Sequence, residues 1–157
     1  TVPCLQTNDY ILDESLEIMM WALNINDPKN WLRETDKSLE LIAACDGPFK
    51  NALDRTKYPN RYPDESAVEN RVLASNFLDF IENQLSPCLF GENFNLADIA
   101  ILPFVRQFAH IDFDWFLSQP WPKTAEWLEN FKTSEMFNSV MKKYPKWEEN
   151  DPVTLFP

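Results

Sequence analysis

The sequence predicts a mainly α-helical protein that begins with a short β-hairpin. Apolar residues recur at helical spacing through most of the 157 residues, and 45% of the residues are hydrophobic, which suits one compact unit with a core. Only two glycines occur against twelve prolines, and few glycines disfavour an all-β protein with its many turns. The first dozen residues depart from the helical spacing, because two short apolar stretches there flank a turn.

The start of the chain predicts two strands and the beginning of a helix. Val2 and Leu5 suit a strand, residues 7–9 are turn formers, and residues 10–12 suit a second strand. A proline after valine at the head of a strand is often in the cis form, which exposes a neighbouring backbone amide. Asp13 is the expected N-cap of the helix that follows. Free N–H groups at that helix start bind carboxylates, and Ser15 adds a hydroxyl donor.

Residues 14–26 predict a helix that is apolar nearly all round. One stripe consists of Leu16, Met19, Met20 and Leu23, and the other consists of Ile18, Trp21, Ala22 and Ile25. A helix of this kind is usually buried between two layers of protein. The range 26–28 (Asn-Asp-Pro) then ends the helix.

The middle of the chain predicts a kinked helix, a loop and a long helix. Helical spacing over residues 36–46 is interrupted at Gly47-Pro48 and resumes over 49–53, as in one kinked helix or two in series. Prolines set a loop over 58–63, and Asp64 is the expected cap of a helix over 65–85. The residues expected to face inward on that helix are Leu73, Phe77, Phe80 and Ile81.

A capping box predicts the start of the next helix, which runs to about His110. Asn95 is the N-cap, Asp98 stands where it can reach back to the cap, and Phe94 and Ile99 occupy the staple positions. Pro103 falls inside this helix and should kink it.

Two closing helices are predicted over 121–131 and 134–144, with Ser134 as the cap of the second. The range 145–157 is expected to be irregular. The residues expected inside the two helices are Trp127, Leu128, Phe131, Phe137, Val140 and Met141.

Charge and cysteine content exclude several classes of function. The net charge of −11 repels phosphate backbones and anionic lipids, so we expect no nucleic-acid or membrane partner. No apolar run approaches the roughly 20 residues that span a bilayer. Three widely spaced cysteines fit reduced thiols in the cytoplasm, and Cys4 is expected to be a buried structural thiol. We see no metal-binding pattern.

Taken together, these residues resemble the glutathione transferase superfamily. The matches are Val2-Pro3, Glu14-Ser15, the range 94–100 with Gly91 before it, and the ranges 46–50 and 103–108, in the family's order and spacing. The resemblance implies a glutathione-transferase-type C-terminal helical domain, preceded by a short β-hairpin and helix left from a thioredoxin-like domain. Residues 1–26 would be that remnant, and residues 27–157 the all-α domain.

The resemblance also implies a partial site for glutathione, the co-substrate. Val2 and Pro3 would hold its cysteinyl backbone, and Glu14 and Ser15 its γ-glutamyl end. The segment that carries the family's thiol-activating residue has no match, so the resemblance supplies no catalytic residue. It implies a truncated form of an enzyme that conjugates glutathione to electrophilic small molecules, and a homodimer, because the apolar face of helix 14–26 would otherwise be exposed.

Two other functions stay open at this stage. One is a non-catalytic module of the same fold that binds a protein partner or regulates a stress response. The other is a thiol-disulfide or peroxide-related enzyme in which Cys4 participates.

Several further side chains are candidate site residues. His110 with Asp112 nearby could form a base, but a histidine at a helix C-terminus is the favoured interpretation. Arg106 could face a substrate cleft or form an ion pair. The remaining candidates are expected to pack in the core or lie in loops: Tyr10, Tyr58, Tyr62, Trp115, Phe116 and Trp121.

Overall fold

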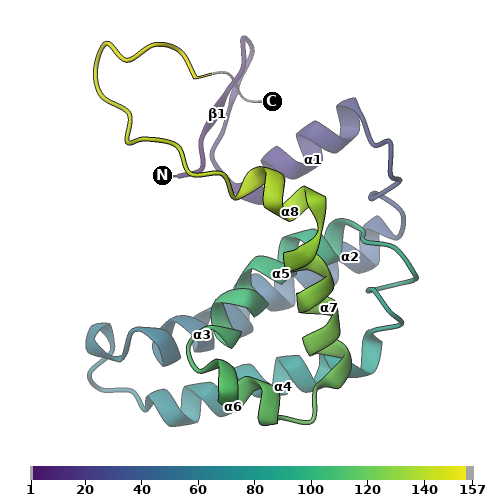
Figure 1. Cartoon of the computed structure of the whole chain (residues 1–157), viewed down its shortest axis with the longest axis vertical. Helices are drawn as coiled ribbons and strands as arrows, with labels where there is room; N and C mark the ends of the chain where they lie inside the picture. Colours follow the sequence, from purple (N-terminus) through teal and green to yellow (C-terminus); the bar gives the residue numbers. More distant parts are fainter. Residues whose placement is uncertain (1, 155–157) are drawn as a thin grey trace.

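A computed structural model of the chain describes residues 2–154 and shows helices stacked below a small hairpin (Figure 1). The predicted fold class is confirmed, because the described residues are mainly helical and carry one two-stranded antiparallel sheet. The elements are β1 (Leu5–Gln6), β2 (Ile11–Leu12), α1 (Ser15–Ile25), α2 (Thr35–Ala44), the π-helical turn η1 (Cys45–Phe49), α3 (Lys50–Lys57), the 3-10 turn η2 (Pro59–Arg61), α4 (Ala67–Gln84), α5 (Leu96–Ala109), α6 (Phe113–Ser118), α7 (Pro122–Thr133) and α8 (Glu135–Val140).

The hairpin has the predicted position and turn. Leu5 pairs with Leu12 and Gln6 with Ile11. The Thr7 hydroxyl oxygen accepts hydrogen bonds from the backbone N–H of Asp9 and Tyr10, which closes the turn between the strands. The Val2–Pro3 peptide bond is cis, as the sequence predicted.

Helix α1 differs from the prediction in its cap and in its burial. It begins at Ser15, with Glu14 rather than Asp13 in the N-cap position and without a side-chain capping bond. One predicted stripe packs against the core, but α1 contains no buried residue. The second stripe is only partly covered by the hairpin, since Ile25 is 67% exposed. Two-residue strands are too short to form a second covering layer, so burial between two layers was a wrong prediction for the described residues.

The kinked helix predicted around Gly47-Pro48 is confirmed. Helix α2 passes into α3 through η1, whose wider π-helical turn contains Pro48. A proline inside a helix lacks an N–H group and clashes with the preceding turn, and a π-turn accommodates it. Cys45 and Phe49 of this turn are buried in the core.

Helix α4 is rotated relative to the predicted inward face. Ile81 is buried as expected and Phe77 is half-buried, but Leu73 is 59% exposed and Phe80 is 48% exposed. The predicted cap was also wrong by two residues, because Ser66 rather than Asp64 accepts from the Glu69 N–H. The residues that α4 buries are Asn70, Ala74, Leu78 and Ile81. We attribute the rotation to the packing of α3 along α4. The small side chain of Ala74 leaves room for α3 on that face.

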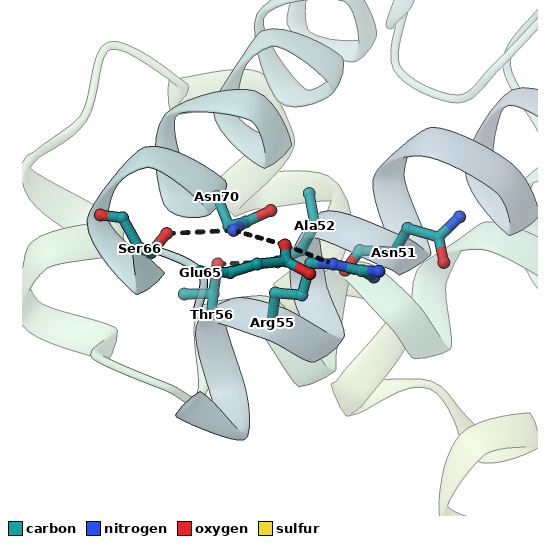
Figure 2. Close-up of polar contacts among 7 residues, drawn as sticks. All are labelled: Asn51, Ala52, Arg55, Thr56, Glu65, Ser66 and Asn70. Carbon is teal, nitrogen blue, oxygen red and sulfur yellow. Dashed lines mark hydrogen bonds and ion pairs between the residues drawn. The ribbon is translucent and has the colours of Figure 1, made fainter. Parts of the chain in front are cut away.

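A polar network joins the end of α3 to the start of α4 (Figure 2). Arg55 Nε donates to Glu65 Oε2 at 2.6 Å. The buried Asn70 side chain donates to the same carboxylate oxygen at 3.4 Å and to the Ser66 carbonyl at 3.0 Å. These contacts anchor the turn before α4 to α3, so their role is structural.

Helix α5 runs through the core between α2 and α7 (Figure 1). The predicted capping box is confirmed: Asn95 Oδ1 accepts from the Ala97 N–H, and Asp98 Oδ2 accepts from the Asn95 N–H. Pro103 lies inside the helix, as predicted.

The last helices include one that the sequence did not predict, the short helix α6, which Asp112 caps. In α7, the predicted inward residues Trp127, Leu128 and Phe131 are buried. Ser134 caps α8 as predicted.

Helix α8 ends at Val140, before the predicted residue 144. Phe137 packs against the core, but Val140 and Met141 are exposed, so their predicted burial was wrong. Within the predicted irregular range, residues 145–154 contain no helix or strand; residues 155–157, and Thr1 of the predicted N-terminal domain, lie outside the described residues.

Candidate functional site

The four residues expected to bind glutathione lie at the open end of the hairpin. Val2 and Pro3 precede β1, and Glu14 and Ser15 follow β2. The register that pairs Leu5 with Leu12 would, if continued, set Pro3 against Glu14 and Val2 against Ser15. The structure therefore brings the two halves of the predicted site onto neighbouring chain segments.

The site is an open edge. All four residues are exposed, and Val2 is 97% exposed. The first N–H in α1 with a backbone partner is that of Ile18, which donates to the Glu14 carbonyl at 3.1 Å. Within residues 2–154, no hydrogen bond engages the N–H groups of Ser15, Leu16 or Glu17. Unpaired donors at a helix start attract carboxylates.

Two cavities lie away from this edge. One of about 640 Å³ lies between the linker over 29–33, the loop at 93–94 and the start of α8. Another of about 400 Å³ lies between α2 and α4 and is mostly apolar. Neither was predicted from the sequence, because each collects residues from distant segments that share no spacing pattern.

His110 and Asp112 do not pair as a general base would require. His110 ends α5 as expected, but Asp112 accepts from the Trp115 N–H and lies 3.7 Å from Arg71. Burial, followed by the charges of Arg106 and Lys132, lowers the pKa of His110 from its usual value.

Arg106 forms neither of the two expected interactions within the described part of the chain. No ion pair engages it, and its Nε atom is buried without a hydrogen-bond partner. Its guanidinium group lies over the ring of Phe137, 5.5 Å from the centroid, which is a cation–π contact.

The aromatic candidates pack as expected. Trp121 lies 5.8 Å from Trp115 and 5.7 Å from Phe116, and its indole N–H donates to Asp79. Tyr10 is fixed by a hydrogen bond from the indole of Trp21. The loop tyrosines at 58 and 62 lie under arginine side chains.

Cysteine burial corrects one prediction. Cys4 is exposed, so its predicted role as a buried structural thiol was wrong: the hairpin has no layer that could cover it. Cys45 and Cys88 are buried, and both are free thiols. Burial raises the pKa of Cys88 to about 11, and raises that of Cys45 still further. Both buried thiols are therefore poor nucleophiles.

Among residues 2–154, no cluster of His, Cys, Asp and Glu is arranged to hold a metal ion. None of the helices in that range has the length and apolar character needed to cross a membrane.

Part of the helical region matches a known protein family. Residues 65–130 match the family described as Glutathione S-transferase, C-terminal domain. This segment of the chain resembles that family. A crystal structure of a glutathione S-transferase from Actinobacillus pleuropneumoniae has a TM-score of 0.69 and 17% sequence identity, and the match covers 89% of this chain and 67% of that chain. At this identity the likeness concerns the fold. No curated protein matches the sequence.

The capping box at the start of α5 lies inside the matched segment, whereas the candidate glutathione residues lie outside it. Asn95 and Asp98 are thus part of the segment that resembles the family. Val2, Pro3, Glu14 and Ser15 depend on the resemblance at the start of the chain and on the geometry of its open edge.

Proposed function

We propose that this chain is a glutathione transferase-type protein that binds glutathione along the edge formed by Val2, Pro3, Glu14 and Ser15. The observation that carries the proposal is the start of α1, where unpaired N–H groups lie on the segment next to that of Val2 and Pro3. The match of residues 65–130 to the glutathione S-transferase C-terminal family also supports it. We also propose that residues 1–26 are a thioredoxin-like remnant and residues 27–157 the all-α domain.

Each part of glutathione has a matching group at this edge. The backbone at Val2 would hydrogen-bond the cysteinyl peptide. The N–H groups at the start of α1 and the Ser15 hydroxyl would donate to the γ-glutamyl carboxylate. The Glu14 carboxylate would accept from the γ-glutamyl ammonium group.

The activity proposed for the complete protein is conjugation of glutathione to electrophilic small molecules. The glutathione thiol loses its proton, the thiolate sulfur forms a bond to an electrophilic carbon, and a displaced group leaves with the electron pair of its bond. A hydrogen-bond donor that lowers the thiol pKa favours this step. We assign no catalytic residue among residues 2–154, because the segment that carries the family's thiol-activating residue has no match in this sequence.

The proposal includes a homodimer and a cytoplasmic location. Exposed apolar side chains on α1 and α4 support self-association, since large apolar patches on a free surface are often covered in an assembly. Three free cysteines are compatible with a reducing compartment.

Calorimetric titration of the purified chain with glutathione tests the binding. We expect saturable binding that Ser15→Ala weakens about tenfold, the equivalent of one charge-assisted hydrogen bond of roughly 1.4 kcal/mol. Glu14→Gln should weaken it about as much. The matched controls Ser86→Ala and Glu126→Gln alter exposed residues without side-chain hydrogen bonds and should leave binding unchanged.

Absence of glutathione binding by a folded chain would contradict the proposal. That result would favour the alternative, a non-catalytic module of the same fold that binds a protein partner or regulates a stress response. The net charge of −11 and the exposed apolar face of α4 are the features that such a partner would meet.

A further inference from the structure

The cavity of about 640 Å³ is a second candidate site, formed by three separate chain segments. Its volume lies in the range of small-molecule sites, roughly 300–1,000 Å³. The lining residues used below are Lys29, Trp31, Arg33, Asn93, Phe94 and Glu135. None of them belongs to the proposed glutathione edge, so the inference is independent of the proposed function.

The linker that carries Lys29 and Arg33 is held in one conformation. The Asp27 carboxylate accepts from the N–H groups of Trp31 at 2.7 Å and Leu32 at 2.9 Å. The Trp31 carbonyl in turn accepts from the Leu96 N–H at 3.1 Å, which fixes the linker to the start of α5. A site built on a fixed loop binds with less loss of conformational freedom.

Arg33 joins two walls of the cavity. Its guanidinium group donates to the carbonyl of Asn30, at 3.1 Å, and to the carbonyl of Asn93 in a second segment of the lining. No carboxylate pairs with Arg33 or with Lys29 in the part of the chain that the structure describes. The guanidinium group is therefore held by carbonyl groups and has no ion-pair partner at the cavity wall, although its charge is close enough to lower the pKa of the buried Asp98.

The cavity also differs in charge from the rest of the molecule. The chain carries a net charge of −11, yet the lining contains two cations, Lys29 and Arg33, against one acid, Glu135. Trp31 and Phe94 add two aromatic side chains to the same lining. A lining with two cations that form no ion pair and with two aromatic side chains matches a ligand that has a flat apolar body and a negative group.

We propose that this cavity binds a small planar aromatic anion, of the aryl carboxylate class. The carboxylate lies toward Lys29 and Arg33, and the ring lies against Trp31 and Phe94. Glu135 opposes the negative charge and limits the affinity. Arg33 also holds the two loops together, so Lys29 is the residue whose charge can be removed without loosening the cavity.

Calorimetric titration of the whole chain with 1-naphthoate tests the proposal. We expect saturable one-to-one binding that weakens as salt is added. The neutral analogue 1-naphthalenemethanol and the non-aromatic cyclohexanecarboxylate should each bind at least about fivefold more weakly. Excess glutathione should not displace 1-naphthoate, which separates this site from the proposed glutathione edge.

Two variants are expected to change the affinity for 1-naphthoate in opposite directions. Lys29→Gln should weaken 1-naphthoate binding about threefold, and Glu135→Gln should tighten it about threefold, as expected for single charges near a surface. The control Lys143→Gln alters an exposed lysine outside the cavity lining and should change nothing. Equal binding of the acid and the alcohol, equal affinities of the Lys29 and Glu135 variants, or displacement by glutathione would each overturn the proposal. So would the absence of binding by a chain that melts normally.

Discussion

The indole N–H of Trp127 donates a hydrogen bond to Oδ1 of Asp98 at 2.8 Å, which joins α7 to the start of α5. Asp98 is fully buried and also accepts from the N–H groups of Leu89 at 2.9 Å and Asn95 at 2.8 Å. A single carboxylate therefore fixes a loop, a helix cap and a neighbouring helix at once. The same residue that forms the capping box also sets the packing of the domain.

We predict that Asp98→Ala destabilises the chain by about 4 kcal/mol at pH 7, because it leaves three buried donors without an acceptor. Trp127→Phe removes only one donor and should cost about 1–2 kcal/mol. Denaturant unfolding followed by circular dichroism measures both. The control Asp64→Asn, at an exposed acid, should change the free energy of unfolding by less than about 0.5 kcal/mol. A similar cost for Asp64→Asn and Asp98→Ala would show that the buried network is unimportant.

A second prediction concerns pH. Burial raises the pKa of Asp98 from 3.8 to about 6, and the hydrogen bonds from Leu89, Asn95 and Trp127 lower it only in part. The folded chain therefore takes up this proton more readily than the unfolded chain. The resulting stability is fully present below pH 4 and is lost as the pH rises through about 6. We expect a change of roughly 3 kcal/mol across this interval.

Other carboxylates titrate over the same interval, so the measurement compares wild type with Asp98→Asn. The free energy of unfolding of wild type, minus that of the variant, should fall as the pH rises from 4 to 6 and then stay level. A difference that rises with pH would show that the hydrogen bonds outweigh burial at Asp98.

A third prediction concerns the thiols. Cys4 is exposed, whereas Cys45 and Cys88 are buried with raised pKa values. A thiol-specific chromogenic reagent at pH 8 should therefore titrate one thiol quickly in the folded chain and the other two only on unfolding. Cys4→Ser should abolish the fast phase. Rapid reaction of two or three thiols in the folded chain would contradict the burial of Cys45 and Cys88.

The start of α5 could be predicted from sequence because its cap is local. Asn95 and Asp98 bond to backbone groups within a few residues, so their spacing carries the whole signal. The inward face of α4 could not be predicted in the same way. Leu73 and Phe80 are as apolar as core residues, and only the approach of α3 turns Asn70 and Ala74 inward instead.

The two candidate sites also differ in whether their residues are close together in the sequence. The hairpin and α1 are adjacent in sequence, so Val2, Pro3, Glu14 and Ser15 could be brought together by reading two strands and a turn. The cavity beside Lys29 could not be found, because Asn93 and Glu135 are far from residues 29–33 in sequence and meet them only in the folded chain. The sequence does show part of this cavity as a lysine, a tryptophan and an arginine within 29–33. That combination is common in exposed linkers.

A fourth prediction concerns the network between α3 and α4 (Figure 2). Arg55 and Glu65 are 2.6 Å apart and partly exposed, and Asn70 donates to the same carboxylate. A double-mutant cycle of Arg55→Ala and Glu65→Ala should give a coupling energy of about 0.5–1 kcal/mol that salt reduces. The exposed pair Lys37 and Glu34 is the control and should couple by less than about 0.5 kcal/mol. Equal coupling in the two pairs would indicate that Asn70 adds nothing to the network.

The last prediction follows from the exposed apolar face of α4 and from the proposed homodimer. Val68, Val72 and Leu73 are 74%, 59% and 59% exposed. The positions 68 and 72 are one helical turn apart, so their side chains form a continuous apolar surface. A lysine in the middle of a covered apolar surface has to be desolvated, which weakens association. We therefore expect sedimentation equilibrium to show a dimer at about 50 µM, with a dissociation constant that Val72→Lys raises at least tenfold.

Ile25→Lys tests the alternative face on α1, and Val153→Lys, in the exposed C-terminal segment, is the control. A larger effect of Ile25→Lys would move the interface to α1, and a monomeric wild type at this concentration would contradict the dimer itself.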